Sequence, residues 1–443
     1  MEVEIISREY IKPSSPTPSH LRNLTLSFLD QKFAPFIIPV LLFYEVSEGS
    51  IPLDMSRLKI CLSETLTTFY PLAGRYQTWG TILCNDEGIP FVEAQVNCPL
   101  SDVLSSISSS TINLISFYPP NKDDLIASRV QLAIQVNVFT CGGFAIGWYH
   151  THKVTDNISA ATFFRHWAAL VTHRCEDTAQ AQPDFNAGVT AFPPVPEQDQ
   201  KPVTPALKNN KPEKQVLVRS FLFKKQAVTE LKAKSISDRV PNPTRFESVS
   251  GFLWKQLLLA SRKVDRSVFS LTIDLRTRSD PPLPNVSMGN LIEIAWATVE
   301  KQAELPELVA EIHETISKMK DIVSEYRGEK REAARETYRQ NFMEAIFECK
   351  GKNVYGLTSW CNAAGFGDVD FGFGKPKWIV PIDGILDKIL RNAIVLTDYT
   401  DEDGDGFEAW MFFEEESIKF LETSDEFLAF ASPNFKLDNA SIC

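Results

Sequence analysis

The chain has 443 residues, which is more than one hydrophobic core usually supports, so two domains are expected. It carries 45 Lys and Arg residues against 57 Asp and Glu residues, and the net charge of −12 disfavours nucleic acid, whose phosphates favour basic surfaces. Hydrophobic residues make up 44% of the chain and charged residues 23%, as in ordinary globular proteins.

The N-terminus and the cysteines indicate in which cellular compartment the protein is expected. The first ten residues lack the basic and then apolar segments of a signal peptide. The most apolar run, residues 33–44, is too short to cross a bilayer and contains two prolines, so we predict a buried strand there. None of the eight cysteines belongs to a Cys-x-x-Cys pair, which favours reduced thiols. We therefore expect a cytoplasmic protein with no membrane partner.

The first half of the chain alternates strand and helix patterns. Residues 131–140 and 144–149 predict two strands. After Asp156 the apolar residues recur at helical spacing, in a stripe of Ala160, Phe163, Phe164, Trp167, Ala168 and Val171. His152 and Asp156 are therefore expected where a strand ends and a helix begins.

Residues 185–215 are rich in proline, lysine, glutamine and asparagine, which predicts an extended connection between domains. Beyond it we predict strands at 216–223 and 268–276, helices at 247–260 and within 305–348, and strands around Trp378, Ile394 and Trp410. The patterns indicate an α/β (α+β) protein of two similar-sized domains, residues 1–190 and 216–443, with a crossover linker at 191–215.

His152 and Asp156 form a His-x-x-x-Asp pattern. Imidazole is the side chain that accepts a proton most readily near neutral pH, so a positioned histidine is the default general base. His150 has Val154 at the matching position, so we interpret His150 as a strand-end residue that is packed or hydrogen-bonded locally. Asp156 directly precedes the helical stripe and is expected to cap the helix, a role compatible with holding His152.

Two other patterns are weaker indications of a catalytic or binding site. The stretch Asp370-Phe-Gly-Phe-Gly374 lacks the third glycine and the following helix of a dinucleotide fingerprint, so a structural loop is its plain interpretation. Asp401–Gly406 resembles the start of a calcium loop, but Phe412 replaces the required glutamate, so we predict a hairpin turn. The sequence contains no Gly-x-Ser-x-Gly elbow and no His and Cys cluster with zinc spacing, so we expect no metal.

Further segments complete a pattern that runs along the chain: Ile11–Pro18, Asp30–Gln31, Phe69–Arg75, Cys84–Asp86, Cys141–Gly143, His152–Asp156, Pro281–Pro284, Gly289–Asn290, Thr358–Trp360 and Asp370–Gly374. Each segment alone is weak, but their order is specific. Together they resemble the plant BAHD acyltransferases, which move an acyl group from coenzyme A to an alcohol or amine.

The resemblance implies a monomer of two chloramphenicol-acetyltransferase-like domains, with mixed sheets flanked by helices and an active-site channel at the domain interface. His152 matches the general base of the family. Asp156 matches the aspartate that, in relatives, points away from the substrate and pairs with an arginine, which here is Arg276. No cofactor would be bound permanently, because acyl-CoA is a co-substrate.

Other family positions are carried over by their motifs. Thr358 and Trp360 match residues that line the acyl site, and Thr358 is our candidate donor to the oxyanion of the tetrahedral state. Thr244 lies where relatives contact the cofactor. We assign Asp370, Gly372 and Gly374, the second signature of the family, to the cofactor side of the channel, which that signature is thought to shape structurally.

Two positions depart from the family pattern. Phe373 stands where the second signature usually has tryptophan, which keeps aromatic bulk but removes an N–H donor. Asn157 stands where glycine usually follows the first signature, and asparagine is the residue that best replaces glycine in a left-handed turn. Neither change removes the base, so we expect activity.

The resemblance is strongest to the subgroup of vinorine synthase and other alkaloid acetyltransferases. It implies acetyl transfer from acetyl-CoA to a hydroxyl of an alkaloid or terpenoid alcohol. Acylsugar-forming enzymes share these features, so a sucrose-type acceptor is the alternative. A catalytically silent ligand-binding relative and a thioesterase are further alternatives.

Overall fold

The computed structural model describes residues 1–33, 37–47, 49, 51–105, 111, 114–115, 129–174, 182–196, 216–261, 266–300, 302–349, 353–362, 365–381 and 392–437. By its contacts the chain divides into two units. Unit 1 comprises Met1–Lys208, Leu283–Leu291 and Asn362–Leu386, and unit 2 comprises Asn209–Pro282, Ile292–Cys361 and Asp387–Cys443. The linear boundaries expected from the sequence place 283–291 and 362–386 in the second domain, whereas the contacts assign both to unit 1. Most of the expected linker, 197–215, lies outside the described residues.

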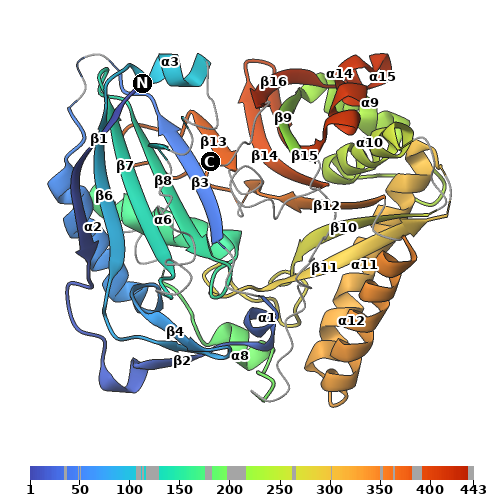
Figure 1. Cartoon of the computed structure of the whole chain (residues 1–443). Helices are drawn as coiled ribbons and strands as arrows, with labels where there is room; N and C mark the ends of the chain where they lie inside the picture. The colour runs from blue at the N-terminus through green and yellow to red at the C-terminus, as the bar shows by residue number, and fades with distance from the viewer. Residues whose placement is uncertain are drawn as a thin grey trace. The chain divides into compact units, whose positions relative to one another are not determined.

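Unit 1 is built on a six-stranded mixed sheet (Figure 1). Its order is β1 (Val3–Ile11), β6 (Ile89–Val96), β7 (Leu132–Phe139), β8 (Phe144–Thr151), β3 (Ile37–Tyr44) and β13 (Trp378–Pro381). Among these strands, β6 and β7 pair in parallel and the other neighbours pair antiparallel. A small sheet contains β2 (Asn23–Thr25), β5 (Thr81–Leu83) and β4 (Arg75–Thr78). The shorter helices are α1 (Phe28–Gln31), α3 (Leu100–Ser105) and α8 (Ala187–Ala191).

Helices α2 (Met55–Thr68) and α6 (Asn157–Val171) pack on the large sheet and on each other. The apolar stripe predicted after Asp156 turns toward the sheet, where the rings of Phe164 and Trp148 lie 4.1 Å apart between centroids. Trp167 donates its indole N–H to the carbonyl of Leu58 on α2 over 3.0 Å. Because burial of large aromatic side chains dominates core stability, these contacts fix α6 against β8.

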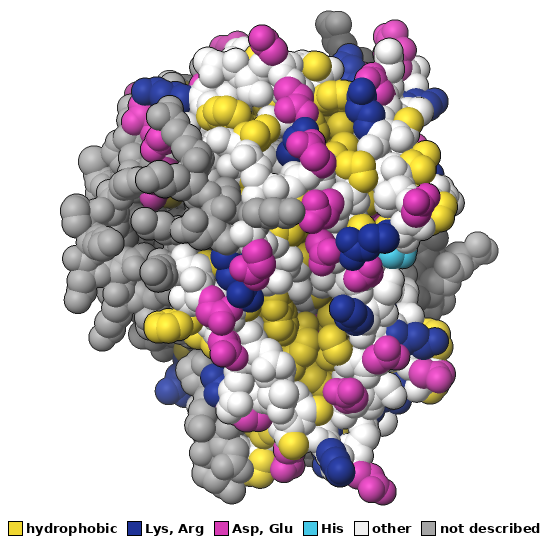
Figure 2. Space-filling model, turned by 90° about the vertical axis from the view of Figure 1, so that its right-hand side faces the viewer, with side chains coloured by type: hydrophobic (Ala, Val, Ile, Leu, Met, Phe, Trp, Pro, Cys, Tyr) yellow, Lys and Arg dark blue, Asp and Glu magenta, His cyan; other side chains and the backbone are white. Residues whose placement is uncertain are grey.

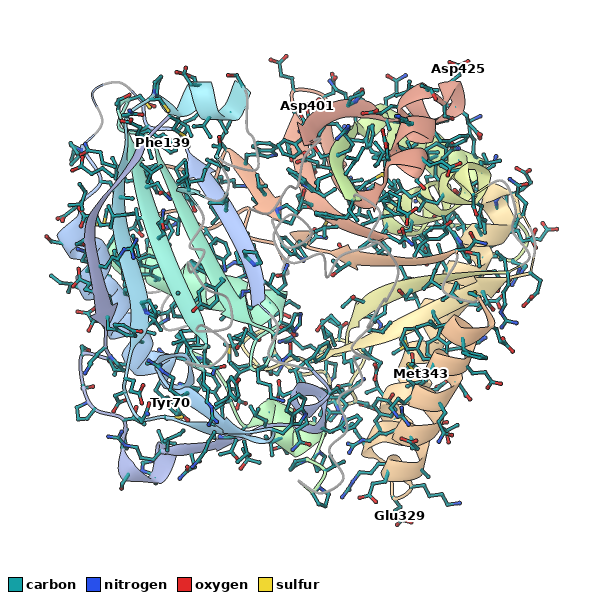
Figure 3. All side chains as sticks on the ribbon, in the orientation of Figure 1. Tyr70, Phe139, Glu329, Met343, Asp401 and Asp425 are labelled. Carbon is teal, nitrogen blue, oxygen red and sulfur yellow. The ribbon has the colours of Figure 1, made fainter. Side chains whose placement is uncertain are left out.

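Unit 2 contains a seven-stranded mixed sheet in the order β11 (Ile292–Val299), β10 (Ser267–Asp274), β12 (Val354–Ser359), β14 (Ala393–Asp401), β15 (Gly404–Glu414), β9 (Val216–Phe223) and β16 (Ser432–Leu437). Its helices are α9 (Lys225–Lys234), α10 (Arg245–Ala260), α11 (Leu305–Arg327), α12 (Arg331–Glu348), α14 (Glu415–Thr423) and α15 (Asp425–Leu428). The charged helical stretch predicted within 305–348 is thus two helices, and Glu329 lies in the turn between them (Figure 3).

The calcium-like segment is a hairpin turn, as predicted. Asp401 closes β14 and pairs with Gly404 at the start of β15, and Gly404 has a φ of +117°. On the molecular face drawn in Figure 2, acidic and basic side chains alternate instead of gathering by sign. Among the described residues, no helix is both long and apolar enough to span a bilayer.

Candidate active site

His152 is the first residue after β8, in the short connection to α6. The end of β8 is anchored by the backbone of Thr151, whose N–H donates to the carbonyl of Gln131 over 2.9 Å. The connection folds back on itself, because the hydroxyl of Thr155 donates to the carbonyl of Thr151 over 3.2 Å. The histidine therefore stands on a rigid strand end, at the strand-to-helix junction that the sequence predicts.

Asp156 caps α6, as predicted, and also holds a distant loop. Its Oδ1 accepts the N–H of Ser159 over 2.9 Å, and its Oδ2 accepts the N–H of Leu291 over 3.0 Å. The carboxylate is 2% exposed. Asp156 therefore ties the loop 283–291 to the start of α6.

That loop places Asn290 beside the base. The Asn290 Nδ2 donates to the carbonyl of His152 over 3.1 Å and to Oδ1 of Asp30 over 3.2 Å. Both partners only accept hydrogen bonds, so the amide nitrogen must face them and the amide oxygen must face the ring of His152. Nδ1 of His152 lies 2.5 Å from this oxygen.

The contact with Asn290 selects the tautomer of His152. An amide oxygen accepts only, so Nδ1 must carry the ring proton, and Nε2 of the neutral ring keeps its lone pair. Burial lowers the pKa of His152 below 6.5, although Asp156 and Asn290 act in the opposite direction. The ring is therefore neutral near pH 7 and can accept a proton at Nε2.

Two more side chains hold this region. The ring of Phe33 stacks on that of His152, with 4.8 Å between centroids and 19° between planes. Lys153 is 1% exposed, and its ammonium lies 4.2 Å from the ring centroid of Trp79 and donates to the carbonyl of Phe33 over 3.2 Å. Burial lowers the pKa of Lys153 to about 8. Sequence reasoning missed Phe33, Lys153 and the role of Asn290.

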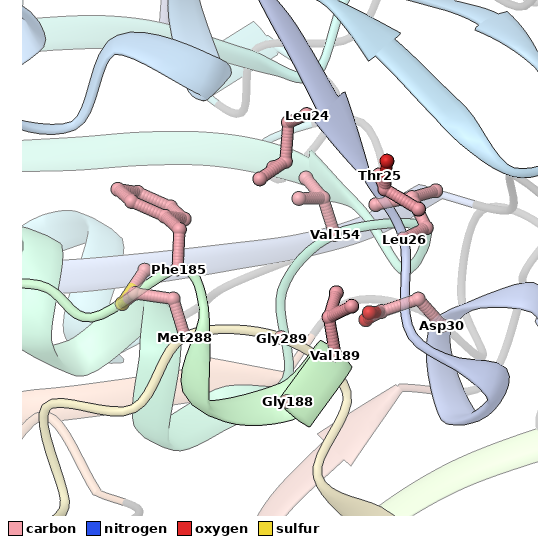
Figure 4. Close-up of a pocket in the computed structure, with 10 residues that line it drawn as sticks. All are labelled: Leu24, Thr25, Leu26, Asp30, Val154, Phe185, Gly188, Val189, Met288 and Gly289. Carbon is pink, nitrogen blue, oxygen red and sulfur yellow. The ribbon is translucent and has the colours of Figure 1, made fainter. Parts of the chain in front are cut away.

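A small cavity lies behind these contacts, lined by Leu24, Thr25, Leu26, Asp30, Val154, Phe185, Gly188, Val189, Met288 and Gly289 (Figure 4). Its volume of about 10 Å³ is too small for an acyl group or an acceptor. Asp30 is the one charged residue among these ten lining residues, and the cavity lies next to the residues that hold His152 in place.

His150 is buried two positions before His152, with 6.3 Å between the ring centroids. It is 2% exposed, and neither ring nitrogen has a hydrogen-bond partner among the described residues. Burial lowers its pKa to about 3, and His152 contributes in the same direction. His150 is therefore a neutral histidine that is packed, and not hydrogen-bonded, among the described residues. Packing was one of the two roles predicted for it from the sequence.

The second signature forms a tight loop in unit 1. Oδ1 of Asp370 accepts the N–H groups of Gly372 and Gly374 over 2.7 and 2.9 Å. Both glycines have positive φ, +98° and +85°, which residues with a side chain rarely adopt. Arg174 donates to the carbonyl of Asp370 over 2.6 Å, and the ring of Phe373 packs edge-on against Phe144. These contacts support the structural interpretation of the motif.

The remaining predicted residues lie in unit 2. Arg276 is fully buried and pairs with Asp274 over 2.9 Å. Thr358 stands near the end of β12, and Trp360 follows it, 6% exposed. Thr244 caps α10, where its Oγ1 accepts the N–H of Glu247 over 3.1 Å. The pairing of Asp156 with Arg276 and the contacts of these residues with substrates stay predictions.

Comparison with known proteins adds the family. A sequence profile of the Transferase family matches residues 1–428. The chain is 33% identical to stemmadenine O-acetyltransferase of Catharanthus roseus, over 98% of this chain and 99% of that one. It is also 33% identical to vinorine synthase of Rauvolfia serpentina, over 95% and 96% of the two chains.

Solved structures agree with the sequence comparison. The crystal structure of vinorine synthase matches with a TM-score of 0.80 and 32% identity, over 97% of this chain and 99% of that one. The Fusarium protein TRI101, crystallised with coenzyme A and T-2, matches with a TM-score of 0.66 and 17% identity, over 93% and 100%, which supports the two-unit fold alone. The chain belongs to the Transferase family and is an acyltransferase of the BAHD type.

Proposed function

We propose that this protein transfers an acyl group, chiefly acetyl, from coenzyme A to a hydroxyl of a specialised metabolite, with His152 as the general base. The observation that carries the proposal is the contact between His152 Nδ1 and the amide oxygen of Asn290. It leaves Nε2 of a neutral, half-buried imidazole as a proton acceptor, which an alcohol needs before it becomes a good nucleophile.

The reaction needs no covalent enzyme intermediate. Nε2 of His152 takes the hydroxyl proton while the oxygen of the acceptor attacks the thioester carbonyl. The carbonyl becomes an oxyanion, for which the hydroxyl of Thr358 is the proposed donor, as the family resemblance implies. When the carbon–sulfur bond breaks, His152 returns its proton to the departing thiolate. The products are the ester and free coenzyme A.

The acceptor is proposed from the relatives. Stemmadenine O-acetyltransferase and limonoid 21-O-acetyltransferase of Citrus sinensis, which is 31% identical, bear names that specify O-acetyl transfer to an alkaloid and to a limonoid. We therefore propose an alkaloid or terpenoid alcohol as acceptor and acetyl-CoA as donor. A sucrose-type acceptor is the second candidate. The expected cytoplasmic location and monomeric state stay predictions.

The test measures release of free thiol from acetyl-CoA in the presence of pooled alkaloid alcohols and, separately, sucrose esters. The wild type, His152→Ala and His20→Ala are compared, since His20 is an exposed histidine outside the site. We expect acceptor-dependent release that His152→Ala abolishes and His20→Ala retains. Near-wild-type release by folded His152→Ala would refute the base.

The same assay separates the alternatives. Release that depends on sucrose esters selects the acylsugar function. Release without any acceptor, faster than acyl transfer to every alcohol, indicates a thioesterase. If folded protein binds coenzyme A but releases no thiol with any acceptor, the chain is a silent relative and the proposed function fails.

A further inference from the structure

Asp30 is a buried carboxylate, 4% exposed, that accepts hydrogen bonds from two directions. Its Oδ2 accepts the N–H and the hydroxyl of Ser27 over 3.0 and 2.6 Å, which closes the capping box of α1. Its Oδ1 accepts the N–H and the side-chain amide of Asn290 over 2.7 and 3.2 Å. A cap for a helix of four residues needs only the first pair, so the second pair calls for its own explanation.

The second pair sets the orientation of Asn290. With its backbone N–H and its Nδ2 on the same carboxylate oxygen, the amide of Asn290 cannot turn over without placing its oxygen against Oδ1 of Asp30. Such a turn would bring two acceptors together inside the protein and leave a buried donor without its partner. Asp30 therefore fixes which atom of the amide faces His152.

The backbone is shaped for this approach. Gly289 has a φ of +123°, and a Cβ there would lie only 3.2 and 3.4 Å from the two oxygens of Asp30. A side chain at position 289 would push the carboxylate away from Asn290. The glycine therefore gives Asp30 access to the next residue of the loop.

The segment around Asp30 also touches His152 directly. Phe33 lies three residues after Asp30 and stacks on the imidazole. Lys153 is the neighbour of the base, and its ammonium donates to the carbonyl of Phe33. The same ammonium nitrogen lies 3.5 Å from the carbonyl oxygen of Asp30. One short segment thus holds the ring plane of His152 through Phe33 and its hydrogen-bond partner through Asp30.

We propose that Asp30 is a positioning residue for His152, which orients Asn290 so that the ring proton stays on Nδ1 and Nε2 remains the proton acceptor. The effect of Asp30 on catalysis rests on the proposed function. The tautomer of His152 does not, because it can be observed without substrate. A free neutral imidazole can carry its proton on either nitrogen, and a base with the proton on the wrong nitrogen cannot accept one at Nε2.

The tautomer is read by nuclear magnetic resonance of the ring nitrogens in protein labelled with ¹⁵N-histidine. The His152 signals are identified by their absence from His152→Ala. In the wild type we expect one protonated nitrogen, Nδ1, and one unprotonated nitrogen, Nε2. Asp30→Ala should shift both signals toward averaged values, because the two tautomers then exchange.

Ser27→Ala is the matched control. It removes the hydroxyl that bonds the other oxygen of Asp30 and weakens the same helix cap, but it leaves the contacts with Asn290. We expect the wild-type pattern at Nδ1 and Nε2. If Ser27→Ala and Asp30→Ala change the two signals equally, the role of Asp30 is general support of α1 and the proposal fails.

Asp30→Ser is measured alongside in case the alanine variant does not fold. The serine side chain is shorter than that of aspartate, so it also loses the contact with Asn290, but it stays polar. The proposal is overturned if the wild type carries its proton on Nε2, or if a folded Asp30 variant keeps the wild-type signals. Each of these outcomes is obtained without acceptor, so it is distinct from a failure of the proposed function.

The activity arm follows once an acceptor is found. Asp30→Ala should lower kcat by roughly 10- to 100-fold, with a smaller change in KM for acetyl-CoA, because the defect lies in the proton transfer. A variant that raises KM and keeps kcat would assign Asp30 to substrate binding and overturn its positioning role.

Discussion

Leu291 donates its backbone N–H to Oδ2 of Asp156 over 3.0 Å, although the two residues are 135 positions apart. The other oxygen, Oδ1, accepts the N–H of Ser159. One carboxylate therefore satisfies two backbone donors, one within its own helix and one in the loop that carries Asn290.

Asp156→Asn should destabilise unit 1 by about 1–3 kcal/mol, because the amide NH₂ must face one of two backbone N–H groups. Asp54→Asn is the control, since Asp54 caps α2 through Arg57 N–H and is exposed. Asparagine caps helices as well as aspartate does, so the control should stay within about 0.5 kcal/mol. Urea unfolding followed by tryptophan fluorescence measures both. Equal midpoints for the two variants would contradict the double role of Asp156.

The pH dependence of kcat/KM tests the state of His152. Burial holds the pKa of His152 below 6.5, and the unprotonated form is the base. We therefore expect kcat/KM to rise with pH through an acid limb whose midpoint lies below 6.5, and to be level at pH 7. Rates with acetyl-CoA between about pH 5 and 8 measure this limb, which reports the free enzyme. A midpoint above 6.5 would show that the site favours the charged ring.

Lys153→Met tests the buried ammonium. The pKa of Lys153 is lowered by burial from 10.5 to about 8, so between these values the folded state is neutral while the unfolded state is still charged. The unfolded state then binds more protons, and folding stability rises with pH over this window. The unfolding free energy of the wild type minus that of Lys153→Met should therefore increase from pH 8 upward, by a total on the order of 3 kcal/mol.

Lys59→Met is the control for that experiment. Burial lowers the pKa of Lys59, but its bonds with Glu9 and Glu93 outweigh this and raise the pKa above 10.5. The difference between wild type and Lys59→Met should therefore stay level from about pH 8 to 10. Urea midpoints at several pH values measure both series, and parallel curves for the two lysine variants would be incompatible with a buried, low-pKa Lys153.

His150→Leu tests the buried histidine whose ring nitrogens lack a hydrogen-bond partner in the described part of the chain. Replacing a buried group that lacks hydrogen bonds by an apolar side chain of similar volume removes an unfavourable burial. We expect the thermal midpoint to stay or to rise, measured by calorimetry against wild type. A large fall would mean that the ring nitrogens have partners that stabilise the fold. A stable variant that loses acyl transfer would assign these nitrogens a bond to a substrate.

The sequence predicts the local part of the site well. Helix α6 and its cap follow from an apolar stripe and a preceding aspartate, which are short-range signals, and β9 spans the predicted residues 216–223. The charged stretch within 305–348 is helical as predicted, and the break between α11 and α12 falls at Gly328, inside the segment 327–331.

The residues that hold His152 in place could not be predicted in the same way. Asp30, Asn290 and Phe33 lie more than 100 residues from His152 and carry common residue types, so no spacing rule singles them out. The only signals were two short family motifs, Asp30–Gln31 and Gly289–Asn290, whose meaning depends on the fold bringing them together. Long-range contacts of this kind are created by tertiary packing and leave little trace in local periodicity.

The division of the chain has a practical consequence for chimeric enzymes. A recombination point in the 191–215 connection would take His152 from one parent and Asn290 from the other, because the loop 283–291 is part of unit 1. Strand β13 would be parted from β3, its partner in the sheet, in the same way. A chimera that takes His152 and the residues that hold it from one parent should therefore move residues 1–208, 283–291 and 362–386 as one cassette.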